Sequence, residues 1–192
     1  FYVYPQILVA SDGLETKHGA KTSDWDKFFI WEGIFDDEDL EAKQTRDKHY
    51  HYIFKPTEQH MTSLEALLKG LFRKEHLMEY LQDFILYESA GESVTNKIAM
   101  FNQFYAARKA VQATKKAVLE GKTPEDRRIG VIWHTQGTGK SLTMMFYARK
   151  TLRLKELENP LLLFITDRNN LDEQLYGVFA SLPIVKQATS IR

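Results

Sequence analysis

The chain has 192 residues, of which 43% are hydrophobic and 27% charged, and its 26 basic side chains equal its 26 acidic ones. This is an ordinary globular composition, enough for one large domain or parts of two, and its neutral total gives no argument from net charge for nucleic-acid binding, which needs only a local basic patch. The absence of cysteine excludes disulfides and thiolate zinc sites and fits a reducing compartment. With no signal peptide and no apolar run near the ~20 residues of a membrane span, we expect a cytoplasmic protein with no membrane partner.

The first third of the chain is predicted to hold short strands. Residues 1–10 are rich in aromatic and β-branched side chains, and the chain opens at Phe1 rather than at methionine, so we expect a piece of a longer protein. Residues 11–13 (Ser-Asp-Gly) are a turn signal, and a second strand is predicted over residues 14–17. The aromatic residues 24–31 predict a packed short strand or loop whose rings fill a core.

Helices are predicted for the middle of the chain. Thr62 and Glu65 have the spacing of a capping box, and apolar residues continue at helical spacing as far as Ile85. We expect two helices in this stretch, divided near Gly70 or near the charged residues 73–75.

A further long helix is predicted over residues 96–119. Thr95 is its candidate N-cap, and Gly121 is the signal that ends it. Its apolar residues recur at helical spacing, so one face should pack against a core. A loop over residues 122–128 then leads to the most informative part of the chain.

Residues 131–141 have the organisation of a phosphate-binding loop. An apolar run at residues 131–133 predicts a buried strand, a glycine-rich turn follows, and residues 141–158 favour a helix. Glycines let the turn adopt backbone angles closed to other residues, so that its N–H groups can face phosphate oxygens, and the helix adds unpaired N–H groups and a positive dipole end. The nucleotide-binding residues predicted here are Thr135, Gln136, Gly137, Thr138, Gly139, Lys140 and Ser141.

Two side chains of this loop have predicted chemical roles. Lys140 would neutralise the β and γ phosphates of ATP as the catalytic lysine, and Ser141 would ligate the accompanying Mg²⁺. The general pattern begins with glycine at the position that His134 occupies here. A glycine-rich turn that binds nothing is the alternative interpretation.

A second strand and helix are predicted after the loop. Residues 161–166 form a continuous apolar run, which is typical of a parallel strand buried on both faces, and residues 171–182 predict a helix. This order indicates the first half of a nucleoside-triphosphatase core. Asp167 is the candidate for a metal-holding acid, although an arginine and not a second acid follows it. Alternatively, Thr166 and Arg168 lie in a loop that contacts DNA.

A metal-dependent nuclease site is another interpretation of the residues. Glu15 and Lys17 match the Glu-x-Lys half of such a site, with Asp12 as a second acid. Residues 41–43 match the tripeptide equally well, and Asp12 and Glu15 are closer in sequence than acids on two separate strands should be. We therefore do not expect Glu15 and Lys17 to be catalytic.

Several segments resemble the R (motor and restriction) subunit of type I restriction enzymes, and together they span nearly the whole chain. They are residues 11–15, 64–88, 101–111, 133–141 and 164–174. Residues 133–141 look like that family's ATP-binding motif, in which histidine at the position of His134 is usual. Residues 164–174 look like the next motif of superfamily 2 helicases and translocases, which implies that Asp167 is not the metal-holding acid. Gln103 sits where such motors often use a glutamine to recognise adenine; the alternative is a glutamine on a helix surface.

The resemblance implies an α/β fold in three parts. These are the end of a restriction-nuclease-like domain (1–57), a helical connector (58–121) and the first half of a RecA-like P-loop motor domain with parallel strands (122–192). The implied cofactors are ATP and Mg²⁺, and the implied partners are double-stranded DNA and the modification and specificity subunits. The parent enzyme would translocate along DNA with ATP and cleave it.

The resemblance also implies that the chemistry is divided along the parent chain. The nuclease residues would lie upstream of Phe1, and the Walker B acid and the arginine finger would lie beyond Arg192, so the fragment alone should not turn over ATP. Two alternatives to this function stay open. One is another superfamily 2 DNA motor, and the other is a nucleotide-binding regulatory module without hydrolysis.

Overall fold

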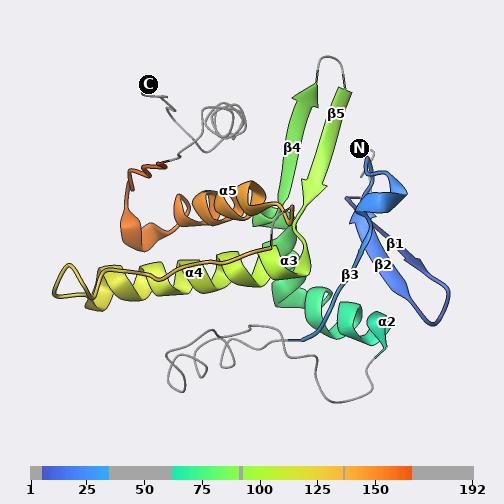
Figure 1. The fold of residues 1–192 in the computed structure, drawn as a ribbon, viewed down its shortest axis with the longest axis horizontal. Helices are drawn as coiled ribbons and strands as arrows, with labels where there is room; N and C mark the ends of the chain where they lie inside the picture. The colour runs from blue at the N-terminus through green and yellow to red at the C-terminus, as the bar shows by residue number, and fades with distance from the viewer. Residues whose placement is uncertain (1–5, 35–61, 91–92, 136, 166–192) are drawn as a thin grey trace. The chain divides into compact units, whose positions relative to one another are not determined.

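A computed structural model describes residues 6–34, 62–90, 93–135 and 137–165 (Figure 1). The chain forms two compact units, Phe1–Phe101 and Asn102–Arg192. The predicted division into three parts at residues 57 and 121 stays a prediction. In the described part of the chain, no helix has both the length and the apolar composition needed to cross a membrane.

The first unit contains a three-stranded antiparallel sheet. Its strands are β1 (Ile7–Ser11), β2 (Thr16–Ala20) and β3 (Phe29–Ile30), in the order β1-β2-β3. The predicted turn at residues 11–13 is confirmed, because Ser11 pairs with Thr16 and the chain reverses between them. The second strand starts at Thr16, two residues later than expected, since the carboxylate of Asp12 accepts hydrogen bonds from the N–H groups of Leu14 and Glu15 and keeps them in the turn.

An aromatic core fills the first unit, as the composition of residues 24–31 predicts. Trp31 is fully buried, with its ring 5.2 Å from that of Phe101 and 6.2 Å from that of Tyr80, both edge to face. Gly70 makes this packing possible, because a Cβ atom there would lie 2.4 Å from the indole nitrogen of Trp31. Trp25 lies in the short 3₁₀ helix η1 (Trp25–Lys27) and is 61% exposed, so it is outside this core.

The predicted capping box and helix break are both present. Thr62 and Glu65 bond each other's backbone N–H at the start of α2 (Ser63–Ala66). The chain continues through a π-helical turn, η2 (Leu67–Leu71), and then changes direction at Arg73, where ψ is 138°. α3 (Lys74–Asp83) follows, so the division near residues 70–75 is confirmed.

A β-hairpin replaces part of the predicted helices. β4 (Ile85–Ala90) pairs antiparallel with β5 (Ser93–Ile98), so extending the first helical region to Ile85 and starting the next helix at residue 96 were both wrong. Burial alternates along β5, with Asn96 and Ile98 buried and Lys97 exposed between them, as the two-residue period of a strand requires. Pairing with β4 therefore overrides the local helical pattern, and Thr95 is a strand residue rather than a cap.

The second unit is built on two helices that lie side by side (Figure 1). α4 (Phe101–Glu120) starts at the last residue of the first unit and ends before Gly121, the predicted stop. α5 (Lys140–Thr151) packs along it, and the hydroxyl groups of Thr114 and Tyr147 are 2.9 Å apart. The helix predicted as far as residue 158 ends at Thr151, and a 3₁₀ turn, η3 (Lys155–Leu157), follows.

Two predicted strands of the second unit are absent from the described residues. Neither residues 131–133 nor residues 161–165 form a strand, and Val131 and Leu161 are 96% and 94% exposed, so the expectation of buried strands was wrong here. A parallel strand exists only through ladder bonds to neighbouring strands and burial by flanking helices, and in the described part of the chain neither segment pairs with another. The observed architecture is thus a mixed α/β fold with small antiparallel sheets.

Candidate nucleotide-binding site

Two glycines give the loop before α5 its shape. Gly137 and Gly139 have φ angles of 85° and 72°, in the left-handed region that L-residues other than glycine adopt at a cost. Between them, the N–H and hydroxyl of Thr138 donate to the carbonyl oxygen of Thr135, at 3.4 and 2.7 Å, and close a tight turn. The local sequence therefore dictates a compact loop that leads directly into a helix.

The start of α5 has the properties of an anion site. Gly139 is its N-cap and offers no side-chain bond, and the first turn has no acidic residue. The first N–H groups of a helix have no partner within it, and they form its positive dipole end. The basic residues Arg149 and Lys150 lie in the last turn of α5, where their positive charges interact favourably with the negative end of the helix dipole. A phosphate would therefore be stabilised at the loop end of α5.

Lys140 and Ser141 are the first two residues of α5. Lys140 is exposed, and its ammonium group turns back over the loop, 3.4 Å from the carbonyl oxygen of Thr135. Ser141 is half-buried on the same turn. The structure thus places a cation over the loop and a hydroxyl beside it.

Gln103 lies against the same loop. Its side chain is 1% exposed, which excludes the alternative of a surface glutamine. Its amide nitrogen donates to the carbonyl oxygens of Thr138 and Gly139, at 3.0 and 3.2 Å. The sequence signal for Gln103 was its position in a family motif, and that signal did not indicate this contact with the loop.

His134 is buried immediately before the loop, with 9% of its surface exposed. Burial lowers the pKa of its imidazole, and the positive charge of Lys140 lowers it further. Within the described residues, Nδ1 of His134 has no hydrogen-bond partner. The residue that departs from the general phosphate-loop pattern is therefore a buried, neutral ring at neutral pH.

The structure brings together most of the predicted nucleotide-binding residues in the second unit. They are Gln103, Thr135, Gly137, Thr138, Gly139, Lys140 and Ser141. Gln136, Thr166, Asp167 and Arg168 lie outside the described residues. No group of three or more His, Asp or Glu side chains in the described ranges is placed to hold a metal ion.

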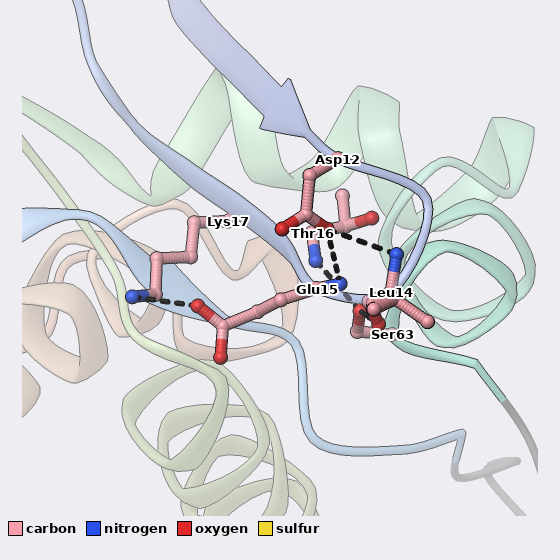
Figure 2. A network of polar contacts seen from close by, with 6 residues as sticks. All are labelled: Asp12, Leu14, Glu15, Thr16, Lys17 and Ser63. Carbon is pink, nitrogen blue, oxygen red and sulfur yellow. Dashed lines mark hydrogen bonds and ion pairs between the residues drawn. The ribbon is translucent and has the colours of Figure 1, made fainter.

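The alternative nuclease residues belong to a closed network in the first unit (Figure 2). Glu15 forms an ion pair with Lys17, 2.7 Å apart, and Asp12 bonds the backbone of its own turn. Ser63 completes the network: its hydroxyl accepts from the N–H of Thr16 at 2.7 Å and donates to the carbonyl oxygen of Leu14 at 3.4 Å. The polar groups of this turn hold β1, β2 and α2 together.

Comparisons with known proteins were made over the whole chain. The family model of the SWI2/SNF2 ATPases matches residues 102–192, which include the loop and α5. A putative type I restriction enzyme MjaIXP endonuclease subunit of Methanocaldococcus jannaschii is 56% identical over 94% of this chain and 17% of its own length. The type I restriction enzyme HindI endonuclease subunit of Haemophilus influenzae is 39% identical over 94% of this chain and 16% of its own length.

A third relative adds weight to these similarities. The putative type I restriction enzyme MjaVIIP endonuclease subunit of M. jannaschii is 35% identical over 60% of this chain and 11% of its own length. No solved structure matches the chain. The chain spans about a sixth of the length of the first two relatives, which it matches at 17% and 16%. The resemblance seen in the motifs is thereby confirmed, and the chain is similar over nearly its whole length to one segment of type I restriction enzyme endonuclease subunits.

Proposed function

We propose that this chain carries the ATP-binding loop of the ATP-dependent subunit that translocates and cleaves DNA in a type I restriction endonuclease. The observation that carries the proposal is the loop at residues 135–141. Two left-handed glycines lead into a helix start that has no side-chain cap, and the Lys140 ammonium lies at the same loop, 3.4 Å from the carbonyl oxygen of Thr135. An ATPase family match over residues 102–192 and the names of the relatives support it.

The residues of the loop fit a nucleoside triphosphate with Mg²⁺. A Cβ atom added to Gly137 would have no other side chain or backbone segment within 4 Å, so the loop is open on that side. Lys140 would act as the catalytic lysine by neutralising the β and γ phosphates, and backbone N–H groups from Gly137 to Lys140 would hold their oxygens. Ser141 would supply one oxygen ligand to Mg²⁺, which usually keeps several waters and binds few protein groups. Bound ATP supplies the phosphoanhydride whose cleavage drives translocation.

The finer architecture is part of the proposal. In the full-length protein, where further strands would pair with them, residues 131–133 and 161–166 would be strands of a RecA-like parallel sheet, which accounts for their apolar side chains. Residues 1–57 would end the nuclease-like domain, residues 58–121 would connect it, and residues 122–192 would begin the motor. Thr166 and Arg168 would contact double-stranded DNA.

The partners and the location are proposed from the relatives. The relatives are named as endonuclease subunits of type I restriction enzymes, which favours a restriction subunit over another superfamily 2 motor. Modification and specificity subunits would bind the full-length protein, and its location would be cytoplasmic. The alternative function, a nucleotide-binding regulatory module without hydrolysis, is tested by measuring ATP hydrolysis by the full-length protein. Multiple turnovers would exclude this alternative.

Replacing Lys140 tests the site directly. Because a charge-assisted hydrogen bond contributes about 1.5–3 kcal/mol, we expect Lys140→Ala to weaken Mg-ATP binding by about ten- to hundredfold in calorimetric titrations of the full-length protein. Lys116→Ala is the matched control, since Lys116 is an exposed lysine on α4. Ser141→Ala should reduce the Mg²⁺ dependence of binding. Unchanged ATP affinity in Lys140→Ala would contradict the proposal.

A further inference from the structure

The carbonyl oxygen of Thr135 is shared by three donors of the phosphate loop. The hydroxyl of Thr138 lies 2.7 Å from this oxygen, whereas the N–H of Thr138 and the ammonium of Lys140 both lie 3.4 Å from it. Hydroxyl donors are most often found at about 2.7–2.8 Å, and N–H donors rarely beyond about 3.2 Å. The hydroxyl of Thr138 is therefore the principal partner of this carbonyl.

This hydroxyl closes the part of the loop that has the most backbone freedom. Thr138 lies between Gly137 and Gly139, whose φ angles are 85° and 72°. Glycine loses more conformational freedom than any other residue when it is fixed in one geometry, so a turn built around it needs a bond that holds it. The bond from the side chain of Thr138 back to Thr135 joins the two ends of this turn.

The position of Lys140 depends on the same carbonyl. A well-formed bond between an ammonium and a carbonyl oxygen is charge-assisted and short, about 2.7–2.9 Å, and a carbonyl oxygen has two lone pairs. The contact of Lys140 is longer, at 3.4 Å, as expected for an acceptor that the hydroxyl already engages. Lys140 is exposed, so its side chain could approach Thr135 more closely if the hydroxyl were absent.

We propose that the hydroxyl of Thr138 is a positioning group that keeps the Lys140 ammonium available to phosphates by holding the carbonyl of Thr135; this inference rests on the proposed function. When Lys140 turns to a bound triphosphate, the carbonyl keeps the hydroxyl as its partner. Without the hydroxyl, the same movement breaks a stronger ammonium–carbonyl bond. Thr135 is exposed, so water replaces part of that loss, and the effect on affinity is severalfold.

The first test removes the hydroxyl and then restores it in the full-length protein. Thr138→Val keeps the branched shape without the hydroxyl, Thr138→Ala removes both, and Thr138→Ser keeps the hydroxyl. Binding of ATP and of inorganic tripolyphosphate, each with Mg²⁺, is measured by calorimetry. We expect the valine and alanine variants to bind both ligands about fivefold more weakly, and the serine variant to bind them within about twofold of the unaltered protein. Full affinity in either variant without the hydroxyl would overturn the proposal.

The second test asks whether the hydroxyl acts through Lys140. Thr138→Val is combined with Lys140→Ala, and the affinities of the four proteins form a double-mutant cycle. If the hydroxyl keeps the ammonium available, Thr138→Val should weaken binding by less than about twofold once Lys140 is gone. A purely structural role for the hydroxyl predicts the same fivefold loss in both backgrounds, and that result would refute the inference.

Thr151→Val is the matched control. It removes a buried hydroxyl at the last residue of α5, for which the described residues offer no hydrogen-bond partner. Its affinity for both ligands should equal that of the unaltered protein, and a loss as large as that of Thr138→Val would contradict a specific role for Thr138.

Failure of the proposed function gives a different pattern. In that case the unaltered protein binds neither ligand, or Lys140→Ala binds them as well as the unaltered protein does. If Lys140→Ala weakens binding but Thr138→Val does not, only the inference about Thr138 fails. The two ideas are therefore separated by measurements on the same set of proteins.

Discussion

The β1–β2 turn together with the start of β2 (residues 12–17) and the phosphate loop (residues 135–141) use similar residues in opposite ways. Each contains a glycine with positive φ, 90° at Gly13 and 72° at Gly139, and each contains a lysine. In the β1–β2 turn, the Asp12 carboxylate accepts from the turn's own backbone, Glu15 pairs with Lys17, and the Ser63 hydroxyl accepts from the backbone N–H of Thr16. In the phosphate loop, the side chains of Gln103 and Lys140 donate hydrogen bonds to backbone carbonyl oxygens, and no side chain caps the start of α5.

The electrostatics of the two regions follow from this difference. The N–H groups of Glu15 and Leu14 hold the pKa of Asp12 below its ordinary value, so the negative charge of its carboxylate is balanced locally. Near the phosphate loop, Lys140 helps to lower the pKa of His134, after burial as the larger cause, which indicates a positive local potential. Residue types alone do not mark a site. A site is marked by polar groups that the protein orients but does not itself satisfy.

The largest expected effect is a loss of stability at acid pH in the first unit, which contains the β1–β2 turn. His18, which follows that turn on β2, is fully buried, and burial lowers its pKa from 6.5 to about 4. The unfolded chain takes up this proton more readily, so stability is complete above pH 6.5 and falls as the pH decreases toward 4. The loss from this residue should reach about 3 kcal/mol, measured by denaturant unfolding across this range. His18→Leu should show a shallower pH dependence; an equally steep one would contradict the assignment.

Gly139→Ala should affect the phosphate loop more than Gly13→Ala affects the turn. Alanine at 139 meets backbone strain and the amide of Gln103, so we expect a loss of about 2 kcal/mol in stability together with weaker ATP binding. Alanine at 13 meets open space and strain alone, about 1 kcal/mol, with no change in ATP binding. Denaturant unfolding and calorimetry on both variants measure this contrast. Equal ATP affinities in the two variants would contradict the expected difference between the loop and the turn.

Ser63→Ala should loosen the closed turn by a moderate amount. The variant loses one bond from the N–H of Thr16 and one to the carbonyl oxygen of Leu14. We expect a loss of about 1 kcal/mol in the free energy of unfolding, because each bond contributes modestly and water can replace part of it. ATP binding should stay at the level of the unaltered protein. A drop in ATP affinity without a drop in stability would show that the turn acts on the nucleotide site.

Glu15→Gln should have the smallest effect. The Glu15–Lys17 pair is on the surface, with the two side chains 52% and 29% exposed, and such pairs contribute little. We expect a change within about 0.5 kcal/mol in the free energy of unfolding. DNA cleavage by the full-length enzyme should also be unchanged, as a plasmid assay would show. Loss of cleavage with normal stability would restore Glu15 as a nuclease residue.

Local signals predicted the structure well where the cause is itself local. The capping box of Thr62 and Glu65, the end of α4 before Gly121, and the glycine turn before α5 each depend on residues within a few positions of one another. The predictions failed where distant strands decide. Residues 93–98 became a strand because β4 pairs with them and because Thr22 bonds Asn96 across 74 positions of sequence.

The amino-acid sequence by itself determined the phosphate loop. Glycines at 137 and 139 permit left-handed angles, and Lys140 and Ser141 begin a helix that no acidic residue opposes. Only the tertiary structure decided what surrounds that loop. It buried His134, placed the amide of Gln103 on the carbonyls of Thr138 and Gly139, and closed the Asp12 turn with Ser63. The physical reason is that hydrogen bonds between distant residues form only when packing brings their atoms within reach, and no local pattern encodes that proximity.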